Sequence, residues 1–285
     1  MTHLVGLIGV GAMGKALLAR LRKANCDVQA YDIAEPALQA ARDGGAKTVA
    51  SAAAAAKGAK FIHVFVRSDA EVSDAVLGPN GVLAGAEPGS TILLHSTILP
   101  TTTRHVAEVA ATRGVRIIDA PITAVPAKVQ AGDAAFLVGG SDADVAAVRD
   151  HLQSLGKSVN HFGPLGAGNV AKLVKNLTNG AERVMIAQAL MLAEAGGIDV
   201  RMLIDIMKSE SQGPLINNWE KAFTLENNHI GLKGGQNIFN KDMPLAAQLT
   251  KIYQLDLGVI REAAAAGMRY TGVTKLDPIP EFKKS

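Results

Sequence analysis

A glycine-rich turn near the amino terminus is the first part of the chain suited to chemistry. The run Gly9-Val10-Gly11-Ala12-Met13-Gly14 follows an apolar stretch and precedes a stretch of helical composition. In that context the first glycine permits a tight turn, the second lets a pyrophosphate approach the backbone, and the third lets helix and strand pack closely. The amino end of the following helix would face the anion. The spacing therefore predicts a dinucleotide site formed by these six residues.

Asp32 ends the next apolar stretch, about 20 residues beyond the turn, where an acid that binds ribose hydroxyls is expected. A carboxylate accepts hydrogen bonds from both ribose hydroxyls of NAD but repels the 2′-phosphate of NADP. NAD is therefore the expected cofactor, with NADP possible. Two alternatives stay open: Asp32 can instead cap the helix beginning near Pro36, and Arg67 can meet a phosphate or be solvated.

Lys172 and Asn176 form the second candidate group, in a helical stretch that follows the run Gly163-Pro164-Leu165-Gly166-Ala167-Gly168. Residues four apart lie on one face of a helix. The neighbours at 170, 173, 174 and 177 are apolar, and partial burial lowers the pKa of a lysine toward the range useful for proton transfer. Lys172 is therefore a candidate general acid/base, and Asn176 is a candidate for orienting a substrate hydroxyl. The alternative is a solvated lysine, as expected of Lys175.

The composition limits the classes of function. Of 285 residues, 48% are apolar and 19% charged, which is typical of a soluble globular protein and excludes disordered or collagen-like chains. The 29 basic and 26 acidic residues form no basic stripe, so nucleic acid is not an expected partner. No apolar stretch reaches the ~18 residues of a membrane span, and no signal peptide is recognisable, so we expect no membrane association and a cytoplasmic protein.

Cysteine and histidine indicate no further site. The single cysteine, Cys26, precedes a predicted strand and is expected to be structural. The histidines lack the spacing of metal ligands, so no metal site is predicted. His63 falls in an apolar strand and is expected to be buried and hydrogen-bonded, whereas His95 lies beside Ser96 near the expected cofactor.

The first half alternates short apolar runs with alanine-rich stretches, which is typical of a parallel sheet with crossover helices. We predict strands over 4–8, 27–31, 61–66, 91–94, 115–118, 134–138 and 158–162. We predict helices over 12–23, 35–42, 50–57, 69–77 and 101–112, and one more after Ser141. This α/β pattern predicts a cofactor-binding domain over residues 1–163.

From Gly166 onward we find only helical stretches, which predicts a second, all-α domain over residues 164–285. Its first helix, 169–195, is free of proline and ends at Gly196-Gly197. At ~1.5 Å per residue this helix would be ~40 Å long, so we expect it to bridge the two domains. Further helices are predicted over 199–208, 213–223, 236–257 and 258–266.

Over nearly its whole length the chain resembles the β-hydroxyacid dehydrogenases, which include 3-hydroxyisobutyrate dehydrogenase. The resemblance rests on the two glycine-rich runs, on Lys172 with Asn176, and on three further motifs. These motifs are Ser96-Thr97-Ile98-Leu99-Pro100, Asp119-Ala120-Pro121 and Lys241-Asp242-Met243-Pro244-Leu245-Ala246. The resemblance implies an N-terminal Rossmann domain, a long interdomain helix and an all-α C-terminal domain like that of 6-phosphogluconate dehydrogenase.

The resemblance also implies a site in the cleft between the two domains, with Lys172 as general acid/base and Asn176 holding the substrate. The residues implied at the cofactor are Val66, Arg67, Thr97 and Lys241, and those at the substrate are Ser96, Thr123, Ala124 and Val125. The family usually has Leu-Pro where this chain has Val66-Arg67. A homodimer or homotetramer is the implied assembly.

One segment departs from the family pattern. Where family members have Ser-Gly-Gly, this chain reads Thr123-Ala124-Val125, followed by Pro126. Thr123 can replace the serine hydroxyl, but the next two residues add side chains, and Pro126 removes an N–H donor and keeps Val125 extended. These changes predict weaker capture of a substrate carboxylate in the family's usual manner.

The expected function is that of an oxidoreductase that moves a hydride between NAD(H) and the alcohol or carbonyl of a small polar molecule, such as a β-hydroxy acid or its semialdehyde. The segment from Thr123 to Val129 is also similar to imine reductases, so NAD(P)H-dependent imine reduction is one alternative. A non-catalytic NAD-binding regulator is another, although it would need neither Lys172 nor Asn176.

Overall fold

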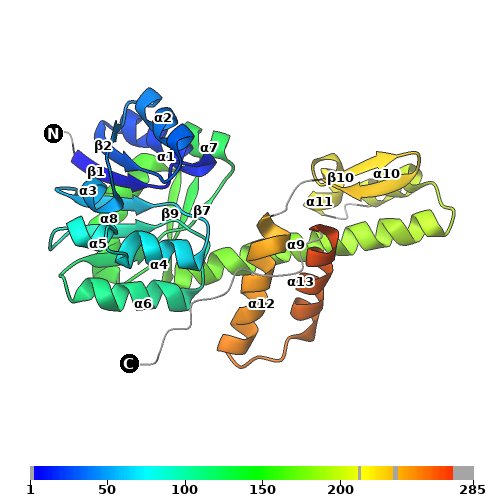
Figure 1. Cartoon of the computed structure of the whole chain (residues 1–285). Helices are drawn as coiled ribbons and strands as arrows, with labels where there is room; N and C mark the ends of the chain where they lie inside the picture. Colours follow the sequence, from blue (N-terminus) through cyan, green and yellow to red (C-terminus); the bar gives the residue numbers. More distant parts are fainter. Residues whose placement is uncertain (1–2, 211–212, 234–236, 272–285) are drawn as a thin grey trace. The chain divides into compact units, whose positions relative to one another are not determined.

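The computed structural model describes residues 3–210, 213–233 and 237–271, which form two compact units (Figure 1). The first unit extends to Lys172, and the second begins at Leu173. Helix α9 (Ala167–Ala195) starts before this division and ends after it. The long helix predicted over 169–195 is therefore present, and it begins two residues earlier than predicted.

A nine-stranded sheet forms the centre of the first unit. Its strands are β1 (His3–Ile8), β2 (Cys26–Tyr31), β3 (Lys47–Thr48), β4 (Phe61–Val64), β5 (Thr91–Leu94), β6 (Arg116–Asp119), β7 (Ile122–Thr123), β8 (Ala135–Gly139) and β9 (Ser158–Gly163). The first six are parallel and lie in the order β3-β2-β1-β4-β5-β6, which is the order of a Rossmann sheet. Strand β8 is antiparallel to β6 and β7 but parallel to β9, so this edge of the sheet is mixed.

Helices cover both faces of this sheet, which explains why its strands are apolar on both sides. They are α1 (Ala12–Lys23), α2 (Glu35–Asp43), α3 (Ala52–Ala56), α4 (Asp69–Leu77), α5 (Val82–Gly85), α6 (Pro100–Ala111), α7 (Pro126–Ala131) and α8 (Asp142–Leu155). Leu7 and Leu93 contribute to a core with α1 and α8, whereas Ile62 and Leu94 contribute to a second core with α3 to α6. In β1, β4 and β5, neighbouring residues of the strand thus enter different cores.

The sequence-based prediction of this unit is confirmed for every element that it named. Each predicted strand and helix is present, with its ends within one or two residues of the expected positions. Pro36 and Pro100 lie in the first turns of α2 and α6, as expected for residues without an N–H. The elements that were not predicted are β3, α5, β7 and α7, which are too short to produce a periodic pattern.

The second unit is helical with one addition. Beyond Leu173 it contains the rest of α9, then α10 (Val200–Ser209), α11 (Pro214–Asn217), the 3₁₀ turn η1 (Trp219–Lys221), β10 (Phe223–Glu226), β11 (His229–Leu232), the π-helical turn η2 (Ile238–Asp242), α12 (Met243–Ile252) and α13 (Gly258–Thr271). The helix predicted over 199–208 is confirmed as α10, and the helix predicted over 258–266 is present as α13 but extends to Thr271. The helix predicted over 236–257 is shorter, and Gln236 lies outside the described residues.

The prediction that no strand follows Gly166 is wrong at one place, because β10 and β11 pair as an antiparallel hairpin. Glu226 pairs with His229 across a two-residue turn formed by Asn227 and Asn228. Both asparagines have positive φ, 49° and 64°, as a type I′ hairpin turn requires. The helix predicted over 213–223 is also wrong beyond Asn217, because the chain leaves α11 to enter this hairpin.

No helix in the described part of the chain combines the length and the apolar character that a membrane crossing requires.

Candidate functional site

The glycine-rich turn connects β1 to α1, and its geometry explains each glycine. Gly9 has φ +88°, and a Cβ there would overlap the carbonyl oxygen of Phe65. A Cβ at Gly14 would overlap the carbonyl oxygen of Gly9. By contrast, the space beside Gly11, the residue at the N-cap of α1, is open. A pyrophosphate can therefore approach the backbone at Gly11 and the amino end of α1, so the turn fits a dinucleotide.

Asp32 lies directly beside this turn, just beyond the end of β2. Its Oδ2 atom accepts a hydrogen bond from the N–H of Val10 at 2.7 Å, and its Oδ1 atom accepts one from the N–H of Ala34 at 2.9 Å. The N-cap residue of α2 is Ala34, so Asp32 forms a local turn rather than the cap considered above. An ionised carboxylate has about four acceptor positions, which leaves positions for ribose hydroxyls.

Two hydrogen bonds join Val66, which follows β4, to Ser96, which follows the neighbouring strand β5. The hydroxyl of Ser96 donates a hydrogen bond to the carbonyl oxygen of Val66 at 2.7 Å and accepts one from its N–H at 3.1 Å. Ser96 is buried, and Thr97 follows it in the chain. Arg67 is exposed, and its guanidinium forms an ion pair with Glu71 at 2.6 Å. The predicted cofactor residues Val66, Arg67 and Thr97 therefore follow the carboxyl ends of β4 and β5, two neighbouring parallel strands.

Lys172 and Asn176 both lie on α9, four residues apart. Lys172 is half-buried and is the last residue of the first unit, while Val174 and Lys175 are exposed. The partial burial expected of Lys172 and the exposure expected of Lys175 are both present. The prediction that Lys172 acts as general acid/base remains a prediction.

Asn176 lies in the second unit, where it is held by the carboxylate of Asp242. The sequence named Asp242 only as part of the motif that begins at Lys241 and assigned it no role. The Nδ2 atom of Asn176 donates a hydrogen bond to Oδ2 of Asp242 at 2.7 Å, and both residues are buried. The Nζ atom of Lys241 lies 2.8 Å from Oδ1 of the same aspartate. Lys241 and Asp242 belong to η2, and π-helical turns of this kind are frequent at functional sites. The structure thus brings Asn176, Lys241 and Asp242 together.

The Thr123-Ala124-Val125 segment runs from the last residue of β7 to the N-cap of α7 in the first unit. Ala124 is partly buried against the core that includes α1 and α8. Val125 has an extended backbone (φ −86°, ψ 160°) and a side chain that is 60% exposed. Pro126 begins α7, so its missing N–H costs no helical hydrogen bond. Of the two added side chains, the one that changes the exposed surface is therefore Val125.

Three histidines form a hydrogen-bonded chain inside the first unit. The ring nitrogens of His151 and His63 lie 2.9 Å apart, those of His63 and His95 lie 2.8 Å apart, and Nδ1 of His95 lies 2.7 Å from the carbonyl oxygen of Ala120. A carbonyl only accepts, so His95 must carry its proton on Nδ1. In the all-neutral chain, His63 then donates from Nδ1, and His151 donates from Nε2. The burial expected of His63 is confirmed, whereas its two partners are found only in the structure.

Burial keeps this chain neutral. It lowers the pKa of His63 well below the ordinary value, and it lowers the pKa of His95 to about 4. The pKa of His151 is also lowered to about 4, first by burial and then by electrostatic interactions with His95, His3 and Lys60, which disfavour its protonation. Phe61 stacks on His151, and Phe136 lies against His95, so apolar rings surround the chain. It ends on a backbone carbonyl, so we regard it as structural.

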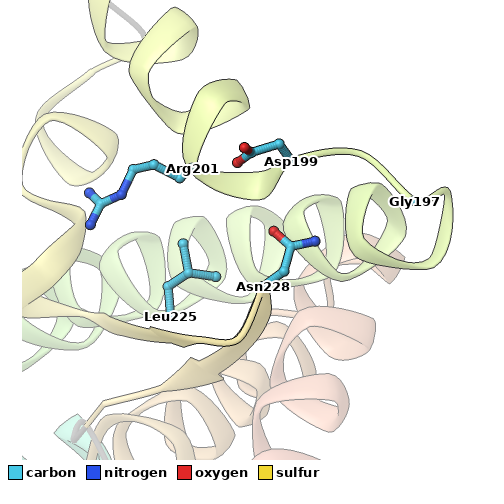
Figure 2. Close-up of a pocket in the computed structure, with 5 residues that line it drawn as sticks. All are labelled: Gly197, Asp199, Arg201, Leu225 and Asn228. Carbon is cyan, nitrogen blue, oxygen red and sulfur yellow. The ribbon is translucent and has the colours of Figure 1, made fainter.

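Figure 2 shows a surface hollow of about 520 Å³ in the second unit, lined by Gly197, Asp199, Arg201, Leu225 and Asn228. The carboxylate of Asp199 accepts a hydrogen bond from the N–H of Met202. The amide oxygen of Asn228 accepts one from the N–H of Val200. These polar groups cap α10, and none of the site residues predicted above is among the five that line the hollow. We therefore assign it no catalytic role.

Among the described residues, no three or more His, Cys, Asp or Glu side chains are arranged to hold a metal ion. Cys26 is buried and is not in a disulfide.

Comparison with known proteins agrees with this geometry. Residues 4–163 match the model of the NAD-binding domain of 6-phosphogluconate dehydrogenase. The chain is 32% identical to 3-hydroxyisobutyrate dehydrogenase of Pseudomonas aeruginosa over 248 residues, which are 85% of this chain and 83% of that protein. It is 30% identical to the NAD-dependent L-serine dehydrogenase of the same organism, over 95% of this chain and 89% of that protein.

Solved structures show the same fold. A 3-hydroxyisobutyrate dehydrogenase of Mycobacterium tuberculosis, solved with L-serine, has a TM-score of 0.82 at 24% identity, and the match covers 95% of this chain and 94% of that one. An imine reductase from Myxococcus stipitatus, solved with NAD⁺, has a lower TM-score of 0.64 at 20% identity, over 95% of this chain and 94% of that one.

The Rossmann sheet, the matched NAD-binding domain and the similarity to dehydrogenases identify an NAD-dependent oxidoreductase. Within that class, the chain belongs to the β-hydroxyacid dehydrogenase family, which includes 3-hydroxyisobutyrate dehydrogenase.

Proposed function

We propose that the enzyme interconverts an alcohol and its carbonyl on a small polar molecule, a β-hydroxy acid or its semialdehyde, with Lys172 as the general acid/base. One observation carries the proposal: Lys172 and Asn176 lie four residues apart on α9, and the amide of Asn176 is oriented by Asp242. Side chains at this spacing lie on one face of a helix, so both can contact one substrate hydroxyl.

The glycine-rich turn of residues 9–14, with Asp32, would hold the pyrophosphate and the ribose of NAD. Val66, Arg67, Thr97 and Lys241 are proposed as further cofactor contacts. When bound, the nicotinamide supplies the acceptor or donor of the hydride. Asp32 favours NAD, because its carboxylate would repel a 2′-phosphate.

The chain's own side chains move the proton and orient the substrate. In the oxidative direction, the neutral amine of Lys172 accepts the proton of the substrate hydroxyl at Nζ. In the reductive direction, the ammonium returns that proton to the carbonyl oxygen. Because the carboxylate of Asp242 accepts from Nδ2 of Asn176, the amide oxygen Oδ1 of Asn176 is the end left to accept from a substrate hydroxyl.

Ser96 and the segment Thr123-Ala124-Val125 are proposed to border the rest of the substrate. The exposed side chain of Val125 narrows the room for a carboxylate, and its extended backbone precedes a proline that offers no N–H. A substrate with a different or larger group at this end is therefore favoured over the shortest hydroxy acids.

An absorbance screen at the NADH band tests the proposed function. The panel contains 3-hydroxyisobutyrate, L-serine, semialdehydes, neutral alcohols and cyclic imines, each with NAD(H) and NADP(H). Oxidation of hydroxy acids with NAD supports the proposal. Reduction of cyclic imines without oxidation of any alcohol would favour the imine reductase alternative instead, and no turnover at all would favour a regulator.

We also propose a cytoplasmic homodimer or homotetramer. In the second unit Met185 and Leu192 are 68% and 75% exposed, and they lie seven residues apart on α9, so they share one face. Met202 and Ile206 of α10 are exposed as well. Apolar side chains grouped in this way favour burial in a contact between subunits. Light scattering coupled to size exclusion measures the mass, and a Leu192→Glu variant should be smaller if the face of α9 forms the contact.

A further inference from the structure

A buried carboxylate holds the beginning of α9, the helix that bears Lys172. Asp119, the last residue of β6, is fully buried. Its Oδ1 atom accepts a hydrogen bond from the N–H of Gly166 at 2.7 Å, and its Oδ2 atom accepts one from the N–H of Asn169 at 2.8 Å. Burial raises the pKa of Asp119, and these backbone donors act in the opposite direction. The carboxylate therefore takes the place of an N-cap for α9.

Glycines provide the space for this carboxylate. A Cβ at Gly168 would lie 2.9 Å from Oδ2 of Asp119, and a Cβ at Gly139 would overlap Oδ1. Gly166 has φ +93°, a conformation that favours glycine. Gly139 and Gly168 thus leave room for the carboxylate of Asp119, and Gly166 allows the backbone conformation in which its N–H meets that carboxylate.

Asn169 extends the contact to the strand end that bears Ser96. Its Nδ2 atom donates a hydrogen bond to the carbonyl oxygen of Ser96 at 3.1 Å, and its Oδ1 atom accepts one from the hydroxyl of Thr103 at 2.8 Å. All three residues are buried. Asn169 is three residues before Lys172, which is less than one helical turn. The same few bonds therefore fix the start of α9 relative to the ends of β5 and β6.

We propose that Asp119 is a positioning residue, which sets Lys172 against the strand ends of the cofactor site by fixing Asn169 and the first turn of α9. The inference rests on the proposed role of Lys172. Proton transfer depends on distance and orientation, and a misplacement of about 1 Å can lower a rate by ~10²-fold. Asp119 does not itself touch substrate in this proposal.

The test is a double-mutant cycle with Asp119→Asn and Lys172→Met. The amide of the variant keeps one acceptor oxygen and loses the other, so one backbone N–H loses its partner. We expect kcat to fall about 10- to 100-fold in Asp119→Asn, while the dissociation constant for NADH stays within about threefold. In the Lys172→Met background the same substitution should change the rate by less than about twofold, because the group that it positions is gone.

Rates are taken with whichever of 3-hydroxyisobutyrate and L-serine the wild type oxidises faster with NAD. Hydrogen exchange at the Gly166 and Asn169 amides gives a second readout that needs no turnover, and at least one of these two amides should exchange faster in Asp119→Asn. Asp199→Asn is the matched control, since it makes the same change from carboxylate to amide at the N-cap of α10, a helix that bears no proposed site residue. It should leave kcat unchanged.

An equal loss of rate in both backgrounds would overturn the inference and leave Asp119 a structural residue. Unchanged kcat in Asp119→Asn would overturn it too. If Asp119→Asn does not fold, Thr103→Val replaces it, because it removes only the hydroxyl that holds Asn169, and a loss of about threefold with the same non-additivity is expected. Lys172→Met is measured first: normal turnover in that variant refutes the proposed role of Lys172, and the inference with it.

Discussion

The carboxylate of Asp32 accepts a hydrogen bond from the backbone N–H of Val10 at 2.7 Å, across 22 residues of sequence. This bond connects the acid that is expected to select the ribose with the turn that is expected to hold the pyrophosphate. Cofactor choice and the shape of the turn therefore depend on the same side chain.

Replacing Asp32 should relax the preference for NAD. In Asp32→Asn the side chain can still accept from Val10 but carries no charge, so we expect kcat/KM with NADP to rise about tenfold while the turn is kept. In Asp32→Ala the bond to Val10 is lost as well, so affinity for both cofactors should decrease. Steady-state kinetics with both cofactors measures this. A wild-type enzyme that favours NADP tenfold would refute the assignment.

Lys172→Met should bind NADH normally and lose most turnover. General acid/base groups contribute ~10²–10⁴-fold, equivalent to ~3–5 kcal/mol of activation free energy. Methionine retains the length and the apolar part of the side chain, so the fold should persist. Lys175→Met is the control, because Lys175 is exposed on the same helix. NADH titration measures cofactor binding, and steady-state kinetics measures turnover. Near-normal turnover in Lys172→Met would mean that another group transfers the proton.

The Thr123-Ala124-Val125 segment should make the enzyme inefficient with 3-hydroxyisobutyrate. Loss of a backbone donor to a carboxylate costs ~1.5–3 kcal/mol, about a tenfold to hundredfold decrease in kcat/KM. The double change Ala124→Gly with Val125→Gly should recover part of that loss. Because Ala124 packs into the core while Val125 is exposed, Val125→Gly alone should give most of the gain. If the wild type already oxidises short hydroxy acids as well as the double variant does, the idea is falsified.

Folding stability should decrease as the pH falls from about 6.5 to 4. In the folded protein the pKa of His95 and of His151 is about 4, below their ordinary value of 6.5. In this interval the unfolded chain binds protons that the folded chain does not, so protonation favours unfolding. The loss is on the order of 3 kcal/mol for His95 alone by pH 4. Urea unfolding at several pH values measures it. His151→Phe should make the free energy of unfolding depend less steeply on pH. An unchanged pH dependence in that variant would contradict the assignment of the effect to the buried histidines.

The sequence by itself determined the order of the elements and the class of the cofactor. Alternation of apolar runs and helical stretches located the strands and helices of the first unit, because a strand buried on both faces must be continuously apolar. The spacing of Gly9, Gly11 and Gly14 identified the turn, because a tight turn, an open approach for the pyrophosphate and close packing of helix on strand each require a residue without a side chain. These are short-range constraints, so they are visible in a linear pattern.

Only the tertiary structure decided which distant residues meet. The hydrogen bonds from Asn176 to Asp242 and from Asn169 to Asp119 connect residues 66 and 50 positions apart, and the bond between His63 and His151 spans 88. Such contacts depend on the order and register of the strands, which a local pattern does not encode. The hairpin β10–β11 escaped prediction because its strands are only partly buried and contain polar residues, so they lack the continuous apolar run that revealed the equally short strands β4 and β5, although Asn227-Asn228 was a turn signal. Sequence thus supplied the reactive groups, and packing supplied the bonds that hold them.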